Sequence, residues 1–219
     1  GWNSADVTIT WSCTNSLSPI LSGTVTQTLT AEGAAQSATG MCQDQAGNTA
    51  SNTQSGINID KTAPTGVSLV PSGTLGNNGW YTSNVTITTT GTEAVSGPLT
   101  CTGVQSLTTD TASATFNGSC TNLAGFTSNA APLTLKRDAT NPTITFLNRT
   151  PANGNGWNNG DVTLNWSCTD AMSGPVDGTI TQTATAEGAN QSSTATCFDN
   201  AGNSASDTQS GINIDKTAP

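Results

Sequence analysis

The chain has 219 residues with 14 acidic side chains, 5 basic ones and no histidine, so its net charge at neutral pH is −9. This balance excludes partners that are themselves strongly negative, namely nucleic acid and anionic membrane surfaces, because a negative chain has no electrostatic attraction to them. The sequence has no run of about 18 apolar residues, so no membrane-spanning segment is expected.

Leu, Ile, Val and Phe supply only about 16% of the residues, whereas Ser and Thr supply roughly 30%. Thr recurs in alternation with Val and Ile, and such β-branched side chains suit a pleated surface. The composition therefore predicts folded β-structure with small cores.

The first predicted strand lies in "DVTITWSCT", where Val7, Ile9, Trp11 and Cys13 share one face. A Ser/Gly/Pro-rich turn region follows, and then come strand-like runs in "GTVTQTLTAEG" and "QSATGMC". The turn "DQAGN" precedes a last strand in "TQSGINID", which leads into Thr-Ala-Pro. Because short strands alternate with turns and no helical periodicity is sustained, we predict a β-sandwich.

The same order of elements recurs along the chain. Residues 1–64 align without a gap to residues 156–219, and about two-thirds of the positions are identical. Residues 79–142 also align to the first segment, with more divergence. We call these segments the first, third and second repeats. An all-β chain of three tandem domains is predicted, with boundaries at 1–64, 65–142 and 143–219.

A strand-like segment precedes the "GW" motif in the second and third predicted domains, as "TGVSLVPSGTLGNN" and "TITFLNRTPANGN". The first domain has no such segment, so it is expected to lack its N-terminal strand. The phrase "GINIDKTAP" occurs at 56–64 and again at 211–219, as a last strand plus a joint. Two interpretations stay open: a chain cut from a longer repetitive protein, or a first domain completed by a neighbouring molecule through donor-strand addition.

Six cysteines fall two to a repeat, and in the second repeat one of them has moved while the pair is kept. This pattern predicts one disulfide per repeat, and each is expected to stabilise the fold by about 3–4 kcal/mol. Two cysteines without histidine make a poor zinc site, whereas disulfides indicate an oxidising, extracytoplasmic location. The expected pairs are Cys13–Cys42, Cys101–Cys120 and Cys168–Cys197.

The stretches "GWYTSNVTIT", "DQAGNTA" with "DNAGNSA", and "IDKTAP" recur in order along the whole chain. Together they resemble the tandem bacterial immunoglobulin-like repeats of large surface adhesins and fibres, and the related hyalin-repeat modules. The resemblance implies immunoglobulin-like sandwiches in an extended rod. It also implies a secreted or cell-surface protein that serves in adhesion, spacing or fibre formation.

Catalysis has little support in the sequence. Glu32, Glu93 and Glu187 are scattered over separate repeats, and no histidine is available. Acid–base or nucleophilic chemistry needs a convergent group of side chains, so the chain is not expected to be an enzyme.

Calcium is the one cofactor that the sequence suggests. Asp60, Asp138 and Asp215 lie at the joints, while Asp44 and Asp199 open the "AGN" turns. Oxygen-rich loops can hold calcium, but Asp and Asn also bond their own backbone in ordinary turns.

The joints between the predicted domains are short and contain proline. Because proline fixes its own φ angle, these joints are expected to limit bending. The joint residues are Asp60 with Pro64, Asp138 with Pro142, and Asp215 with Pro219.

These features favour a structural repeat protein that forms a rod or fibre outside the cell, with further repeats or other copies of itself as partners. One alternative is an adhesin module that binds a glycan or a protein, which predicts an exposed aromatic or acidic cluster confined to one repeat. Another is a non-catalytic accessory region of a secreted carbohydrate-active enzyme.

Overall fold

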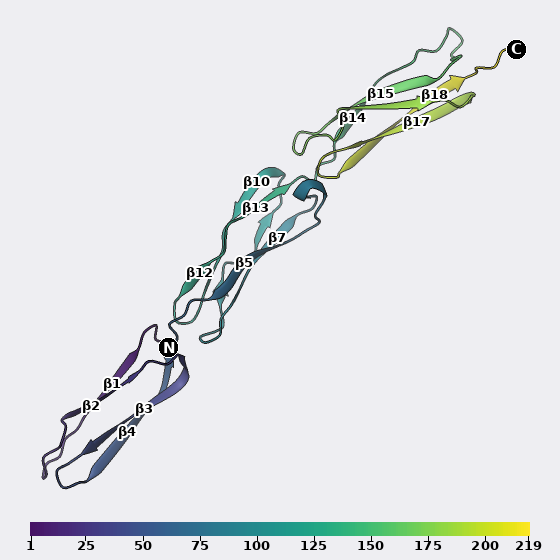
Figure 1. Ribbon diagram of the computed structural model, residues 1–219. Helices are drawn as coiled ribbons and strands as arrows, with labels where there is room; N and C mark the ends of the chain where they lie inside the picture. Colours follow the sequence, from purple (N-terminus) through teal and green to yellow (C-terminus); the bar gives the residue numbers. More distant parts are fainter. The chain divides into compact units, whose positions relative to one another are not determined.

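The computed structural model describes residues 1–219, and its architecture is all-β, as the sequence predicts (Figure 1). The one helical element is a three-residue 3₁₀ turn, η1 (Asn77–Gly79). No helix is therefore long enough to cross a membrane.

The chain divides into two compact units. The first contains Gly1–Val70, Thr88–Val104 and Phe116–Leu133, and the second contains Pro71–Ile87, Gln105–Thr115 and Thr134–Pro219. The second predicted domain contributes strands to both units, and the division into three immunoglobulin-like domains stays a prediction.

The first unit contains two antiparallel strand pairs and one small sheet. Strand β1 (Val7–Ser12) pairs with β2 (Thr24–Leu29), and β3 (Gly33–Gln43) pairs with β4 (Thr49–Ile59). The small sheet has the order β12-β11-β8. Its strands are β8 (Thr100–Cys101), β11 (Ser119–Thr121) and β12 (Thr127–Asn129).

Another sheet, of order β5-β7-β9, contains two strands whose residues belong partly to each unit. These two are β5 (Thr65–Ser72) and β7 (Val85–Thr92), and β9 (Gln105–Leu107) completes the sheet.

The second unit contains two three-stranded sheets and one long hairpin. The sheet β10-β13-β6 is formed by β6 (Trp80–Tyr81), β10 (Thr111–Phe116) and β13 (Leu133–Arg137). The sheet β14-β15-β16 is formed by β14 (Thr143–Arg149), β15 (Val162–Thr169) and β16 (Thr179–Ala184). The hairpin joins β17 (Gly188–Phe198) to β18 (Ser204–Ile214).

The main hydrophobic core lies between β15 and the β17–β18 hairpin. Alternate side chains of β15 point inward, which is the period-2 pattern that the sequence predicts. Phe146 of β14 covers Trp166 edge-on, with 5.5 Å between the ring centroids. The fully enclosed core residues are Val162, Leu164, Trp166, Ala195, Ile212 and Ile214.

The first and third repeats have the same strand registers. Val7 lies opposite Leu29 on β1–β2, and the equivalent residues Val162 and Ala184 lie opposite each other on β15–β16. The β3–β4 and β17–β18 hairpins carry irregularities at equivalent positions. The burial differs, however, because the inward face of β1 is only partly buried whereas that of β15 is fully enclosed.

The outer faces of the strands carry pairs of hydroxyl side chains that bond to each other across neighbouring strands. Thr194 and Thr208 are one such pair, with 2.8 Å between their Oγ1 atoms. The others are Thr8–Thr28, Thr39–Thr53, Thr65–Thr92, Ser68–Thr90, Thr115–Thr134, Thr121–Thr127 and Thr196–Ser206.

Candidate metal centre

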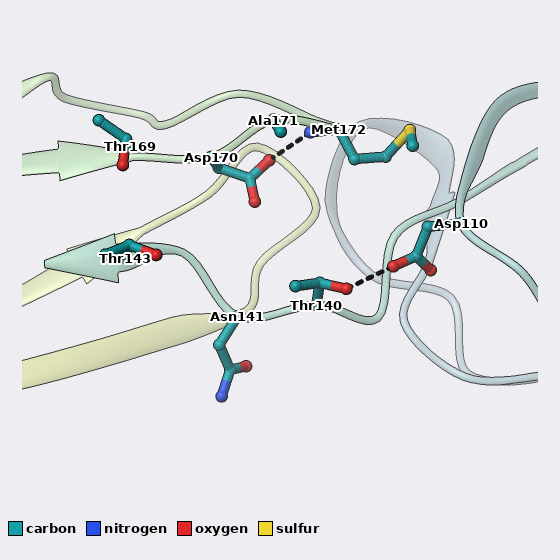
Figure 2. Close-up of a pocket in the computed structure, with 8 residues that line it drawn as sticks. All are labelled: Asp110, Thr140, Asn141, Thr143, Thr169, Asp170, Ala171 and Met172. Carbon is teal, nitrogen blue, oxygen red and sulfur yellow. Dashed lines mark hydrogen bonds between the residues drawn. The ribbon is translucent and has the colours of Figure 1, made fainter.

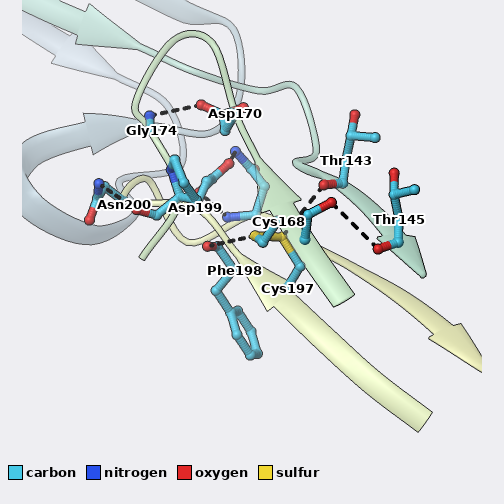
Figure 3. Close-up of a disulfide and its surroundings, with 12 residues drawn as sticks. Thr143, Thr145, Cys168, Asp170, Gly174, Cys197, Phe198, Asp199 and Asn200 are labelled. Carbon is cyan, nitrogen blue, oxygen red and sulfur yellow. Dashed lines mark hydrogen bonds between the residues drawn. A yellow bond between two sulfur atoms is a disulfide. The ribbon is translucent and has the colours of Figure 1, made fainter. Parts of the chain in front are cut away.

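Three disulfides are present, and no cysteine is free. Cys168 and Cys197 are almost fully buried beside the start of β14, with the Cys197 Sγ 4.0 Å from the Thr143 carbonyl oxygen (Figure 3). The structure brings together the pairs Cys13–Cys42, Cys101–Cys120 and Cys168–Cys197. Three disulfides in one chain indicate an oxidising, extracellular environment.

The joint residues divide into buried and exposed sets. Asp60 and Asp138 are fully buried, and Pro64 and Pro142 are buried as well. Asp215 is exposed, and its Oδ1 accepts the backbone N–H of Thr217 in an ordinary turn.

Three carboxylates of the second unit converge at one point. Asp138 follows β13, Asp170 follows β15 and Asp199 follows β17. One carboxylate oxygen from each lies within 4.8 Å of the other two, and Asp138 and Asp199 are fully buried. Of the five calcium candidates that the sequence suggests, the fold gathers only these two Asp residues, and it adds Asp170.

Backbone N–H groups hold these carboxylates in place. The Asp170 Oδ1 accepts hydrogen bonds from the N–H groups of Ser173 and Gly174, each at 2.9 Å. The Ser173 N–H also lies 3.0 Å from the Asp138 Oδ2. The Asp199 Oδ1 accepts from the Asn203 N–H at 2.8 Å. The Asp199 Oδ2 also accepts from the Asn203 Nδ2, at 2.8 Å, and both Asp138 oxygens accept backbone N–H groups, so the Asp170 Oδ2 is the one carboxylate oxygen of the group without a hydrogen-bond partner.

No Lys or Arg side chain pairs with the cluster. The three ion pairs of the chain are Lys61–Asp6, Arg137–Asp110 and Lys216–Asp161. Closely spaced carboxylates repel one another most strongly where they are buried, and a bound cation relieves this repulsion. Calcium takes carboxylate and carbonyl oxygens as ligands, so the donor set fits this ion.

The first unit contains an equivalent group in which an amide replaces one carboxylate. Asp60, Glu93 and Asn122 stand where Asp138, Asp170 and Asp199 stand in the second unit. The Asn122 Nδ2 donates hydrogen bonds to the Asp60 Oδ2 at 2.9 Å and to the Glu93 Oε2 at 3.0 Å. An internal donor thus occupies the position between the two carboxylates.

The surroundings of Asp60 stabilise its ionised form. Burial acts to raise the pKa of Asp60, but the nearby Ser96 and the hydrogen bonds from Thr62 outweigh it and hold the pKa below its usual value. A carboxylate that is already satisfied in this way has less need of a metal ion.

Asp44 of the first repeat lies among amides, not among other carboxylates. Its Oδ2 accepts from the Asn48 Nδ2 at 2.9 Å and from the Asn15 Nδ2 at 3.0 Å. The Asn48 side chain, followed by backbone N–H groups, lowers the pKa of Asp44. Since Asn15 stands at the position of Asp170 in the third repeat, this site also has one carboxylate fewer.

A pocket of about 440 Å³ lies beside the carboxylate cluster in the second unit (Figure 2). Asp170 and Met172 line one side of it, and Asp110 and Thr140 line the other. Burial acts to raise the pKa of Asp110, but the Thr140 hydroxyl, the Ala139 N–H and the Arg137 charge together lower it.

Sequence reasoning missed Asp170 and Glu93. It treated the glutamates as scattered, whereas the fold brings Glu93 to within hydrogen-bond reach of the Asn122 amide that also contacts Asp60. The sequence did contain one signal for these two residues. Glu93 and Asp170 stand at equivalent positions of the second and third repeats, at the same interval after the "GW" motif.

No protein-family model and no curated protein sequence matches the chain. Among solved structures, the chain is similar to one described as "Structural insight into host cell surface retention of a 1.5-MDa bacterial ice-binding adhesin". The two share 13% identity at a TM-score of 0.36, and the match covers 97% of this chain and 92% of that chain. At these values the likeness carries no functional information, so the function proposed below rests on the residues of this chain.

Proposed function

We propose that this chain is part of a structural extracellular protein, in which β-repeats that each contain a disulfide form a rod or fibre that resists a pulling force. The observation that carries the proposal is that the same arrangement of strands and disulfide occurs twice in the chain. The first and third repeats share strand registers, and in both a disulfide spans 29 residues.

A disulfide at this place suits a chain under tension. Cys13 lies just beyond β1 and Cys42 lies near the end of β3, so the bond encloses β2 and most of β3. The enclosed residues cannot extend while the bond is intact. Only two buried side-chain groups, the Thr89 and Ser96 hydroxyls, lack a hydrogen-bond partner.

Single-molecule stretching of the full chain tests this proposal. With the disulfides intact, we expect discrete unfolding events, and those of the first and third repeats should each be shortened by the 29-residue span of the disulfide. Reduction should lengthen each such event by about 100 Å, since an extended residue spans about 3.4 Å. The double variant Cys13→Ala/Cys42→Ala is the matched control and should lengthen one event only. Smooth extension of the oxidised chain at low force, without discrete events, would rule out a role in resisting a pulling force.

As a second function, we propose that the cluster of Asp138, Asp170 and Asp199 binds calcium and thereby stiffens its part of the second unit. The convergence of three carboxylates with no cationic side chain supports this proposal. This cluster has no three-carboxylate counterpart in the first unit. It is largely buried, whereas the alternative of a ligand-binding adhesin module predicts an exposed cluster.

Calorimetric titration of the full chain with calcium tests the second function. Asp170→Asn should weaken binding by about tenfold or more, because one of the few charged ligands is lost. The same change at Asp177, an exposed acid in the same loop, is the matched control and should leave binding unchanged. Equal affinities of the two variants, or no heat of binding in the unmodified chain, would refute a calcium site.

A further inference from the structure

The chain contains five Asn-Gly pairs, and in such a pair the asparagine can react with the backbone that follows it. The glycine nitrogen attacks the asparagine Cγ, since glycine has no Cβ to obstruct the approach. The side-chain nitrogen leaves as ammonia and a succinimide ring forms. Water then opens the ring and gives aspartate or isoaspartate. The pairs are Asn78–Gly79, Asn117–Gly118, Asn153–Gly154, Asn155–Gly156 and Asn159–Gly160.

Hydrogen bonds restrain two of these pairs within one loop of the third repeat. The Asn153 Oδ1 accepts from the backbone N–H groups of Asn155 and Trp157, at 2.9 and 3.0 Å. The Asn153 side chain is therefore held away from the nitrogen of Gly154. The Gly156 N–H donates to the Asn153 carbonyl oxygen at 2.9 Å, so the nitrogen that would attack Asn155 is engaged. Each of these bonds must break before a ring can form.

Two further pairs are restrained at other places. The Asn78 Nδ2 donates to the Asn200 carbonyl oxygen at 3.0 Å, which fixes the amide that would have to turn. Gly118 is closely packed, because a Cβ at this position would lie 2.6 Å from the Thr89 Oγ1 and 2.8 Å from the Leu69 Cδ2. The peptide unit that joins Asn117 to Gly118 thus has little room to rotate.

The pair Asn159–Gly160 has none of these restraints. Asn159 is exposed, and neither its side chain nor the Gly160 N–H makes a hydrogen bond. A Cβ at Gly160 would meet no atom within 4 Å. Both residues line a groove of about 350 Å³. The amide and the attacking nitrogen are therefore free to approach each other, and water can reach them.

This freedom belongs to the third repeat itself. In the second repeat, which another repeat follows, Thr82 and Ser83 stand at the equivalent positions. Their hydrogen bonds go to Thr74, Asn84 and Arg137, all within the second repeat. The position is therefore not covered by the next repeat. The first repeat has Ser4 and Ala5 there, so neither of the other repeats can undergo the reaction at this point.

We propose that Asn159 is a site of spontaneous deamidation, and that the fold protects the other four Asn-Gly pairs. The attack forms the bond between the Gly160 nitrogen and the Asn159 Cγ and breaks the bond from Cγ to Nδ2. Ammonia is released and one water molecule is consumed when the ring opens. No enzyme or oxidant takes part.

Isoaspartate at this position would lengthen the main chain where it is fixed on both sides. The Asn158 N–H donates to the Asn213 carbonyl oxygen at 3.0 Å, and the Asp215 N–H donates to the Asn158 carbonyl oxygen at 2.9 Å. Val162, at the start of β15, is 0% exposed. The extra methylene group must be accommodated between these points. The third repeat would thus acquire an age-dependent change at the entry to its central strand.

Peptide mapping by mass spectrometry tests the proposal on the full chain, with the disulfides intact, after incubation in neutral buffer. We expect Asn159 to deamidate at least about tenfold faster than the hydrogen-bonded sites, because the cost of breaking one hydrogen bond corresponds to roughly this factor in rate. Equal rates at the Asn-Gly pairs, a faster reaction at another pair, or no deamidation at Asn159 would overturn the proposal.

The reduced chain, unfolded in guanidinium chloride, is the control for the role of the fold. Glycine follows the asparagine in every pair, so the rates should converge once the structure is lost. If Asn159 kept the same advantage in the unfolded chain, local sequence would be the cause and protection by the fold would be wrong.

The variant Gly160→Ala is the control for the attacking atom. The added Cβ meets no atom in the folded chain, so the fold should be kept, but it obstructs the approach to the Asn159 Cγ. We expect the product at Asn159 to be strongly reduced and the slow rates at the other pairs to stay as they are. An unchanged rate at Asn159 in this variant would contradict attack by the Gly160 nitrogen.

Discussion

The first and third repeats have nearly the same strands, but their inward-facing side chains are buried to different extents. About two-thirds of their residues are identical and their registers agree, yet Trp166 is 0% exposed whereas Trp11 is only partly buried. The difference lies in β14, which packs Phe146 against Trp166. A core residue is thus enclosed by a strand outside its own repeat segment, and identical sequence does not guarantee identical burial.

The carboxylate groups of the two units differ in a similar way. In the second unit Asp138, Asp170 and Asp199 converge, and in the first unit Asn122 replaces the third acid. The amide donates hydrogen bonds where the carboxylate could only accept them. The presence of Asn122 where the second unit has Asp199 therefore separates a group that satisfies itself from a group that favours a cation.

The largest expected effect comes from removing the two equivalent indoles. Trp166→Ala should destabilise the second unit by about 3–5 kcal/mol, because a fully buried aromatic leaves a cavity. Trp11→Ala should cost about half as much, because part of that surface already faces water. Chemical denaturation of each variant measures both values, and equal losses would mean that β14 does not decide the burial.

For the disulfides of the first and third repeats, unlike for the two tryptophans, we expect equal losses of stability. Removing Cys168–Cys197 or Cys13–Cys42 as a double Ala variant should cost about 3–4 kcal/mol in each case, since the stabilisation depends mainly on loop length in the unfolded chain. Both loops have a sequence separation of 29. Denaturation under oxidising conditions measures the two costs, and a clearly larger loss for the more buried bond would point to folded-state packing as the cause.

The substitution Asn122→Asp would convert the first carboxylate group into the type found in the second unit. Without calcium we expect a loss of about 1–3 kcal/mol, because the donated hydrogen bonds are replaced by repulsion. Calcium should restore part of the loss and should add one binding site to the chain. Thermal unfolding with calcium and with a chelator separates the two effects, and Asn129→Asp, at an exposed position of the first unit, is the control.

The smallest expected effect concerns acid. The folded-state pKa of Asp110 is lowered, so its contribution to stability is complete above its unfolded pKa of about 3.9 and is lost as the pH falls through the lower folded value. Asp110→Asn should cost about 1 kcal/mol at pH 7 and less at about pH 3, where the unfolded-state carboxyl is largely protonated. Unfolding free energies at the two pH values measure this, and a loss that does not depend on pH would contradict the ionic contribution of Asp110 and Arg137.

The strands were predictable because their signals are local. The alternation in "DVTITWSCT" predicts an inward face of Val7, Ile9 and Trp11, and these residues do alternate in burial with exposed Thr and Ser. The repeat also placed the first and third cysteine pairs at matching positions and kept a pair in the second repeat, and the fold brings each pair together.

The carboxylate cluster was not predictable in the same way, because it depends on three chain segments that meet only in the fold. Asp138 and Asp199 could be chosen as turn residues, but nothing local distinguishes Asp170 from other loop acids. The extent of burial of β1 depends on a strand outside β1, so the residues of β1 alone do not encode it. Asp44 and Asp215 are the opposite case. Their residue type and their turns suit a calcium ligand, but the fold brings no group of carboxylates to them.

The paired hydroxyls on the outer faces have a consequence for folding accuracy. If one strand of the β17–β18 hairpin slipped by two residues, every side chain would keep its face, so hydrophobic burial alone would hardly oppose the error. Such a slip would separate Thr194 from Thr208 and Thr196 from Ser206. The outer face of β18 carries a hydroxyl at every second position from Ser204 to Ser210, however, so each of these threonines would meet another hydroxyl. The native alignment therefore depends on a contact that does not repeat along the strand, such as the hydrogen bond from the Trp166 Nε1 to the Asp207 Oδ2.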